Sequence, residues 1–175
     1  MKKAITRLFA VLLLFATLLS VASCEKKNDG KYHVFGLHYD IGEEYKEINV
    51  PYSENCYTNG ESYFFFVVYS AEGLEEIGVA GDISVELYMQ SFLVWNYQSP
   101  TNYTYDKEKN IATTYFISSD MLLPEDVEES EPEFLYHMVL RGASHLYIIT
   151  MSCSPDVKDK CLPEFEAIAA TIWAD

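Results

Sequence analysis

Two of the four cysteines are spaced so that their thiols can form a disulfide bond. Cys153 ends an apolar alternating run, and Cys161 stands just before a segment of helical period. By side-chain parity, Cys153 points to the same face as Tyr147, Ile149 and Met151. A helix returning over this face would bring the two thiols together, and closing so short a loop contributes about 2–3 kcal/mol. Two reduced cysteines in the core are the alternative.

Cys56 lies in the segment Ser53-Glu-Asn-Cys-Tyr57, just before an Asn59-Gly60 turn. It has three interpretations: a free buried thiol, another disulfide partner, or a nucleophile. A nucleophilic thiol needs a neighbouring base to form the thiolate. No histidine stands near Cys56 in the sequence, so catalysis by this thiol is not favoured.

Four histidines supply imidazole nitrogens, which are ligands for transition metals. They are His33, His38, His137 and His145. Strand alternation places His33 and His137 beside apolar neighbours, and His145 lies next to a turn. The favoured interpretation is that each histidine is separately hydrogen-bonded, with metal binding by a subset as the alternative.

Six acidic residues crowd the stretch 125–133. Among them, Glu125, Asp126, Glu128 and Glu129 are the candidates for a cation site. Calcium requires six to eight oxygen ligands in a fixed arrangement. Because this stretch lacks the Asp-x-Asp-x-Asp-Gly spacing that curls a loop around the ion, a solvated acidic loop is favoured.

The sequence contains none of the common motifs that indicate catalysis. There is no Gly-x-Ser-x-Gly, His-Glu-x-x-His, Walker loop, Rossmann glycine fingerprint or Cys-x-x-Cys. Catalytic triads are assembled in space and need no sequence motif, so a hydrolase with an unrecognised site stays an alternative. We expect a protein without catalytic activity and without a cofactor.

The N-terminus resembles a bacterial lipoprotein signal. Lys2, Lys3 and Arg7 precede an apolar core over 9–19, and Val21-Ala22-Ser23-Cys24 looks like a lipobox. The apolar run is short for a transmembrane helix and ends in a cleavage-type motif. The resemblance implies removal of residues 1–23 and lipidation of Cys24. Residues 24–31 would then be a polar linker, and 32–175 one extracytoplasmic domain in an oxidation-permissive compartment.

Cleavage would leave 152 residues, enough for one domain with its own core. It would also remove three positive charges and no negative ones, which takes the formal charge from −15 to −18. So acidic a surface repels nucleic acid and anionic lipid head groups. It would accept cations or basic partners, although solubility is the simpler reason for it.

Apolar periodicity predicts an α+β fold with an antiparallel sheet of about six to seven strands and helices packed on it. The order is βββα-ββββ-α. We expect strands over 32–39, 45–50, 61–70, 102–106, 110–118, 133–141 and 145–153. The strands 61–70 and 145–153 are apolar on both faces and should be central.

The predicted helices cover 83–95 and about 163–172. Asp82 is the candidate N-cap of the first, and one further helical turn is expected near Leu74. Pro163 suits the first turn of the second helix, where its missing N–H would be unpaired in any case. Trp95 and Trp173 are each expected at the end of a helix.

This succession of elements resembles the PsbP-like superfamily, an α/β/α sandwich. The likeness rests on the ending, Leu146-Tyr-Ile-Ile-Thr-Met151, a short polar loop and Phe165-Glu-Ala-Ile-Ala-Ala-Thr-Ile172. It covers roughly residues 32–173 and includes no diagnostic motif, so no residue role can be carried over. It implies an assembly, stability or protein-binding role, generally without catalysis, and some relatives bind metal ions.

The sequence therefore predicts a lipid-anchored accessory protein at the bacterial cell membrane or outer membrane. We expect it to contact the membrane through lipid on Cys24 and to engage a protein partner of the envelope, not nucleic acid. A lipoprotein that binds a small ligand or a metal ion is the alternative. Convergent polar groups would favour that alternative, whereas a smooth apolar patch would favour a protein partner.

Overall fold

A hairpin of two long strands lies at the centre of the structure. The computed structural model describes residues 31–50, 55–95, 102–118 and 131–175. In it, β8 (Phe134–Arg141) pairs antiparallel with β9 (His145–Cys153). The short Gly142-Ala143-Ser144 connection joins them, as the alternating apolar runs predict. Eight of the nine residues in β9 are buried, so the prediction of a central strand covered on both faces is confirmed.

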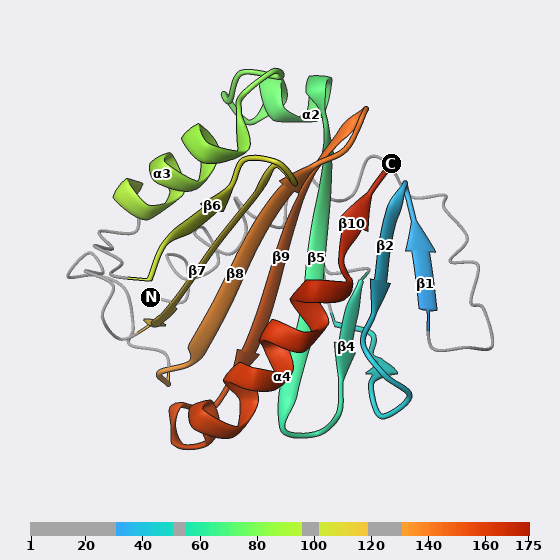
Figure 1. Cartoon of the computed structure of the whole chain (residues 1–175), viewed down its shortest axis with the longest axis vertical. Coiled ribbons are helices and arrows are strands. Elements are labelled where there is room, and N and C mark those ends of the chain that lie inside the picture. Colours follow the sequence, from blue (N-terminus) through green and yellow to red (C-terminus); the bar gives the residue numbers. More distant parts are fainter. Residues whose placement is uncertain (1–30, 51–54, 96–101, 119–130) are drawn as a thin grey trace, which may run out of the picture.

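Seven strands form the large antiparallel sheet, in the order β3-β4-β5-β9-β8-β7-β6 (Figure 1). Their bounds beyond the central hairpin are β3 (Lys46–Glu47), β4 (Cys56–Thr58), β5 (Ser62–Ser70), β6 (Thr104–Asp106) and β7 (Ile111–Ile117). β5 pairs with β9 along its whole length, from Ser62 opposite Cys153 to Ser70 opposite His145. β4 was not predicted, and the strand expected over 45–50 is reduced to the two residues of β3.

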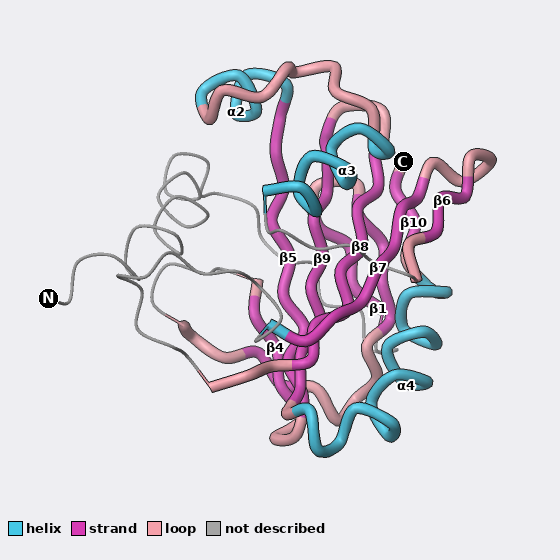
Figure 2. Tube along the Cα trace, turned by 90° about the vertical axis from the view of Figure 1, so that its left-hand side faces the viewer, coloured by secondary structure: helices cyan, strands magenta, loops and turns pink. Residues whose placement is uncertain are grey.

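Each face of the large sheet has its own cover. Figure 2 shows α4 (Lys158–Thr171) on one side, and α2 (Ala71–Glu76) with α3 (Val85–Trp95) on the other. Tyr147, Ile149 and Met151 belong to the core under α4, whereas Leu146 and Ile148 belong to the core under α2 and α3. The predicted α+β class, with helices on both faces of an antiparallel sheet, is therefore confirmed.

The final helix begins earlier than predicted. A 3-10 turn over Pro155–Val157 leads directly into α4 at Lys158, so Pro163 lies inside the helix and not in its first turn. A proline there removes one backbone hydrogen bond. Burial of Cys161, Phe165 and Ile168 against the sheet offsets this cost.

The cap of α3 also differs from the prediction. Ser84, not Asp82, accepts the N–H of Leu87 on its Oγ, at 3.1 Å. The helix accordingly starts at Val85. The short helix α2, near the helical turn expected around Leu74, is capped by Ser70, whose Oγ accepts the N–H of Gly73 at 3.1 Å.

The strand expected over 32–39 is in fact a hairpin, which corrects the prediction of a single strand that belongs to the one antiparallel sheet. β1 (Lys31–Val34) and β2 (Leu37–Asp40) flank a tight turn at Phe35 and Gly36, which have φ of 51° and 83°. A third strand, β10 (Trp173–Ala174), pairs with β2 to give a separate three-stranded sheet. Trp173 therefore follows the last helix as part of a strand.

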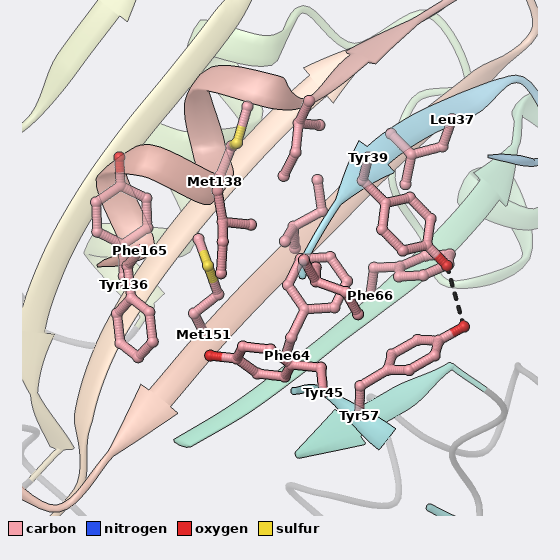
Figure 3. Packing of buried hydrophobic residues seen from close by; sticks show 14 of the residues in the cluster. Leu37, Tyr39, Tyr45, Tyr57, Phe64, Phe66, Tyr136, Met138, Met151 and Phe165 are labelled. Atoms are coloured by element: carbon pink, nitrogen blue, oxygen red, sulfur yellow. Dashed lines mark hydrogen bonds between the residues drawn. The ribbon is translucent and has the colours of Figure 1, made fainter. Parts of the chain in front are cut away.

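The inner face of this small sheet packs on the large sheet beside α4. Tyr39 and Leu37 point into an aromatic core with Phe64, Phe66 and Tyr57 (Figure 3). The hydroxyl groups of Tyr39 and Tyr57 lie 3.0 Å apart within this core. Residues of the opposite parity on β1 and β2 consequently face outward.

Candidate metal centre

Two histidines face each other on the outer side of the small sheet. His33 of β1 is directly opposite His38 of β2, because the Phe35-Gly36 turn lies midway between them. Their rings are stacked, with centroids 4.3 Å apart and planes 20° from parallel. Opposite residues in an antiparallel pair have Cβ atoms about 4.5–5.5 Å apart, so the hairpin itself holds the two imidazoles together.

The third strand adds a carboxylate to the same side. Trp173 of β10 is the strand partner of His38 on β2. Their rings are stacked, with centroids 3.6 Å apart and planes 3° from parallel. Asp175 follows two residues later and therefore points to the same face. Its Oδ1 lies 3.3 Å from Nε2 of His38, and its Oδ2 lies 3.8 Å from Nε2 of His33.

The backbone of Asp175 is held by two different turns. Its N–H donates to the carbonyl of Gly36 at 3.0 Å, and its carbonyl accepts from the N–H of Ala143 at 2.6 Å. Tyr147 on β9 donates its hydroxyl to the carbonyl of Phe35 at 2.5 Å. The β8–β9 hairpin of the large sheet thus holds the histidine hairpin through Tyr147 and the aspartate through Ala143.

Three potential ligand atoms converge at this point. One nitrogen each from His33 and His38 and one carboxylate oxygen from Asp175 all lie within 4.8 Å of one another. The side chains of His33 and Asp175 are 46% and 61% exposed, so solvent reaches the site. Two imidazoles and one carboxylate are a ligand set that suits zinc and related transition ions.

His137 is kept apart from this site. It is buried in β8, where Nδ1 lies 3.0 Å from Oγ1 of Thr150 and the ring stacks on Phe92 at 4.2 Å. Burial lowers the pKa of His137 to about 4, because a charged imidazole would lose its hydration. His137 is therefore a neutral hydrogen-bonded core residue.

His145 is also outside the group of three. It is the first residue of β9, and its ring centroid lies 6.0 Å from that of Phe35 and 6.2 Å from that of Tyr147. Of the four histidines considered from sequence, only His33 and His38 are brought together. Sequence reasoning missed Asp175 and Trp173, although their alternate spacing would place them on one face of a strand.

The cysteine predictions have a mixed outcome. Cys153 and Cys161 are neighbours, as parity predicts, but both are free and buried thiols in this structure. Burial, and the hydrogen bond with Cys161, raise the pKa of Cys153. The disulfide stays a prediction.

Cys56 is a free, buried thiol on β4, opposite Phe65. Burial raises the pKa of Cys56. A raised pKa disfavours the thiolate that a nucleophile requires.

The remaining predicted sites fall outside the described residues. These are the lipidation site Cys24 and the acidic candidates Glu125, Asp126, Glu128 and Glu129. Of the acidic stretch, Glu131 and Glu133 are described and exposed. Among the described residues no helix is both long and apolar enough to cross a membrane.

A pocket lies on the side of the large sheet that α2 and α3 cover. Its cavity volume is about 220 Å³, and Val79, Ile83, Tyr88 and Phe92 are among its lining residues. This lining is mostly apolar and includes no histidine or carboxylate. The small sheet is therefore the better candidate for a ligand site, because imidazole and carboxylate groups converge there.

Comparison with known proteins supports the architecture. No family model and no curated protein matches the sequence. Among solved structures, the chain is similar to the solution structure of cyanobacterial PsbP (CyanoP) from Synechocystis sp. PCC 6803. The match covers 89% of this chain and 99% of that one, with a TM-score of 0.52 and 14% sequence identity. At that identity the likeness concerns the fold alone: the chain folds as a PsbP-like domain.

Proposed function

We propose that this chain is an accessory lipoprotein of the bacterial cell envelope, which has no catalytic activity and engages a protein partner. The observation that carries the proposal is the PsbP-like fold, which extends over nearly the whole of the similar solved chain. The accessory role is what the sequence resemblance to that superfamily implies. The lack of recognisable catalytic motifs is consistent with this role.

The proposed anchor is a lipid on Cys24. The small residues Val21, Ala22 and Ser23 precede this cysteine, and six polar or small residues separate it from β1. A linker of this length reaches on the order of 15 Å as a flexible chain. The domain would therefore stay close to the membrane surface, where its partner would also be found.

The anchor is tested with the variant Cys24→Ala, expressed at the wild-type level. Wild-type protein should fractionate with membranes and incorporate a labelled fatty acid, whereas the variant should do neither. Cys56→Ala is the matched control, since it removes another cysteine and should keep both properties. Membrane association and labelling that are unchanged in Cys24→Ala would refute the lipid anchor.

The partner is tested by crosslinking in intact cells, followed by purification of the anchored chain. The control is an unrelated lipoprotein that carries the same signal and linker. We expect an envelope protein that crosslinks to this domain and not to the control. Identical crosslinked species for both proteins would contradict a specific partner.

A further inference from the structure

We propose that His33, His38 and Asp175 form a binding site for a single divalent transition-metal ion of the zinc class. The ligands come from three different strands or strand ends: β1, β2 and the residue after β10. This inference depends on the small sheet alone and is independent of the lipid anchor.

The separations between the ligand atoms suit a tetrahedral ion. Zinc–nitrogen and zinc–oxygen bonds are about 2.0–2.2 Å long, which places two ligand atoms on a tetrahedral ion about 3.3 Å apart. Oδ1 of Asp175 and Nε2 of His38 are 3.3 Å apart, and Oδ2 and Nε2 of His33 are 3.8 Å apart. The carboxylate of Asp175 is therefore already at a suitable distance from both imidazole nitrogens.

The chemistry of the ligands selects the class of ion. Neutral imidazole suits zinc, copper and nickel, whereas calcium requires six to eight oxygens and magnesium retains most of its water. The site supplies two nitrogens and one carboxylate group. It should therefore discriminate strongly against calcium and magnesium.

The backbone around the site holds the ligands in place before any ion arrives. Both the N–H and the carbonyl of Asp175 are hydrogen-bonded, to Gly36 and Ala143. The Trp173 ring lies against the His38 ring, and such support fixes the orientation of a ligating imidazole. Three protein ligands leave a fourth position of the ion for water, as in open zinc sites. A side chain of a partner could replace that water.

Binding requires one defined rearrangement. A metal ion lies in the plane of the imidazole that coordinates it, so two rings stacked at 20° cannot both bind without turning. His33 is the ring that should turn, because its side chain is 46% exposed, compared with 27% for His38. The Trp173–His38 contact should therefore survive, and Trp173 becomes a reporter close to the ion.

The test uses the full chain, purified in detergent with an affinity tag that contains no histidine. Isothermal titration with ZnCl₂ measures stoichiometry and affinity for the wild type, His33→Ala, His38→Ala and Asp175→Asn. The control is His145→Ala, which removes an imidazole outside the group of three. Circular dichroism checks that each variant is folded, and Asp175→Asn keeps the side-chain shape while it removes the charge.

We expect one zinc ion per chain, and affinity lowered roughly 10–100-fold or more in each ligand variant, as a disrupted metal site commonly shows. His145→Ala should bind as the wild type does, and excess MgCl₂ or CaCl₂ should not compete. Copper should quench tryptophan fluorescence in the wild type and much less in Trp173→Phe. Wild-type zinc affinity in folded Asp175→Asn and His38→Ala, or no saturable binding by the wild type, would overturn the proposal.

Discussion

The carboxylate of Asp175 lies 3.3 Å from Nε2 of His38, although 137 positions separate the two residues in the chain. The contact exists because β10 adds to the edge of the β1–β2 hairpin. The same strand addition aligns Trp173 with His38 and brings the aspartate within reach of His33. The small sheet thus attaches the end of the chain to the β1–β2 hairpin, and it is also where the three proposed metal ligands meet.

Gly142→Ala should weaken the contact between the β8–β9 turn and the end of the chain at Ala174 and Asp175. A Cβ at Gly142 would lie 2.5 Å from the carbonyl oxygen of Asp175 and 3.1 Å from Cβ of Ala174. Since backbone must shift to relieve such a clash, we expect a loss of about 1–3 kcal/mol in the free energy of unfolding, measured by urea denaturation. Gly73→Ala is the control, because its new Cβ would meet nothing closer than 3.5 Å. Equal stability of Gly142→Ala and wild type would contradict the packing.

Tyr45→Phe should destabilise the contact between the chain after β2 and the last helix. The buried hydroxyl of Tyr45 donates to Oε1 of Glu164 at 2.6 Å and lies 2.6 Å from Oγ of Ser62. Burial raises the pKa of Tyr45, as does the bond to Glu164, so the hydroxyl stays protonated. The variant loses both contacts of this hydroxyl and leaves Ser62 and Glu164 with their bonds to Asn59. We therefore expect a loss of about 1–2 kcal/mol in the free energy of unfolding, measured by thermal or urea denaturation.

The matched control is Tyr63→Phe, since the Tyr63 side chain is an exposed large aromatic at 45%. Removal of that hydroxyl should change the free energy of unfolding by less than about 0.5 kcal/mol. If the two variants lose the same stability, the Tyr45–Glu164 bond does not have the assigned role.

His137 should make the protein less stable in mild acid. The pKa of His137 is about 4 in the folded protein, against an ordinary value of 6.5. The unfolded chain therefore binds a proton that the folded chain rejects. The contribution of the neutral His137 to the free energy of unfolding is complete above pH 6.5. It falls by about 1.4 kcal/mol per pH unit as the pH drops towards 4.

The measurement is urea denaturation from pH 7 to pH 4, for wild type and His137→Asn. Asn retains a polar group near the position of Nδ1, which lies 3.0 Å from Oγ1 of Thr150. The variant loses some stability at neutral pH but should show a shallower decline in acid. Parallel curves for the two proteins would argue against a neutral buried imidazole.

Oxidation should join Cys153 to Cys161. The two thiols are buried neighbours at the junction of β9 and α4, and a bond would stabilise the domain by about 2–3 kcal/mol. Protein exported and purified without reductant should contain one alkylatable thiol in its domain after unfolding, namely Cys56. Intact mass before and after reduction gives the count. Three alkylatable thiols would rule out the disulfide.

The part of the large sheet from β5 to β6 could be predicted, because its signals are local. β8 and β9 are long alternating runs joined by a short turn that contains glycine, and their pairing needs no distant information. Parity along β9 also placed Cys153 on the face that α4 covers. The start of α3 was harder to predict, because Asp82 and Ser84 are both residue types that cap helices. The structure shows that Ser84 is the cap, since its Oγ accepts the N–H of Leu87.

The small sheet could not be predicted, since its signals are weak or distant. Phe35 has a φ of 51°, which residues with a side chain rarely adopt, so an apolar run from Tyr32 to Tyr39 gave little sign of a turn. β10 has only two residues, and its pairing with β2 spans most of the chain. The group of His33, His38 and Asp175 depends on both features, so the sequence alone does not indicate that the two histidines are neighbours.

The most direct measurement is X-ray diffraction at the zinc absorption edge from crystals grown with ZnCl₂. We expect one strong anomalous peak within about 2.0–2.2 Å of Nε2 of His33, Nε2 of His38 and a carboxylate oxygen of Asp175. The three-stranded arrangement of β1, β2 and β10 should be intact around it. An anomalous map with no peak between these residues, or with its peak at the buried thiols, would rule out the proposed metal site.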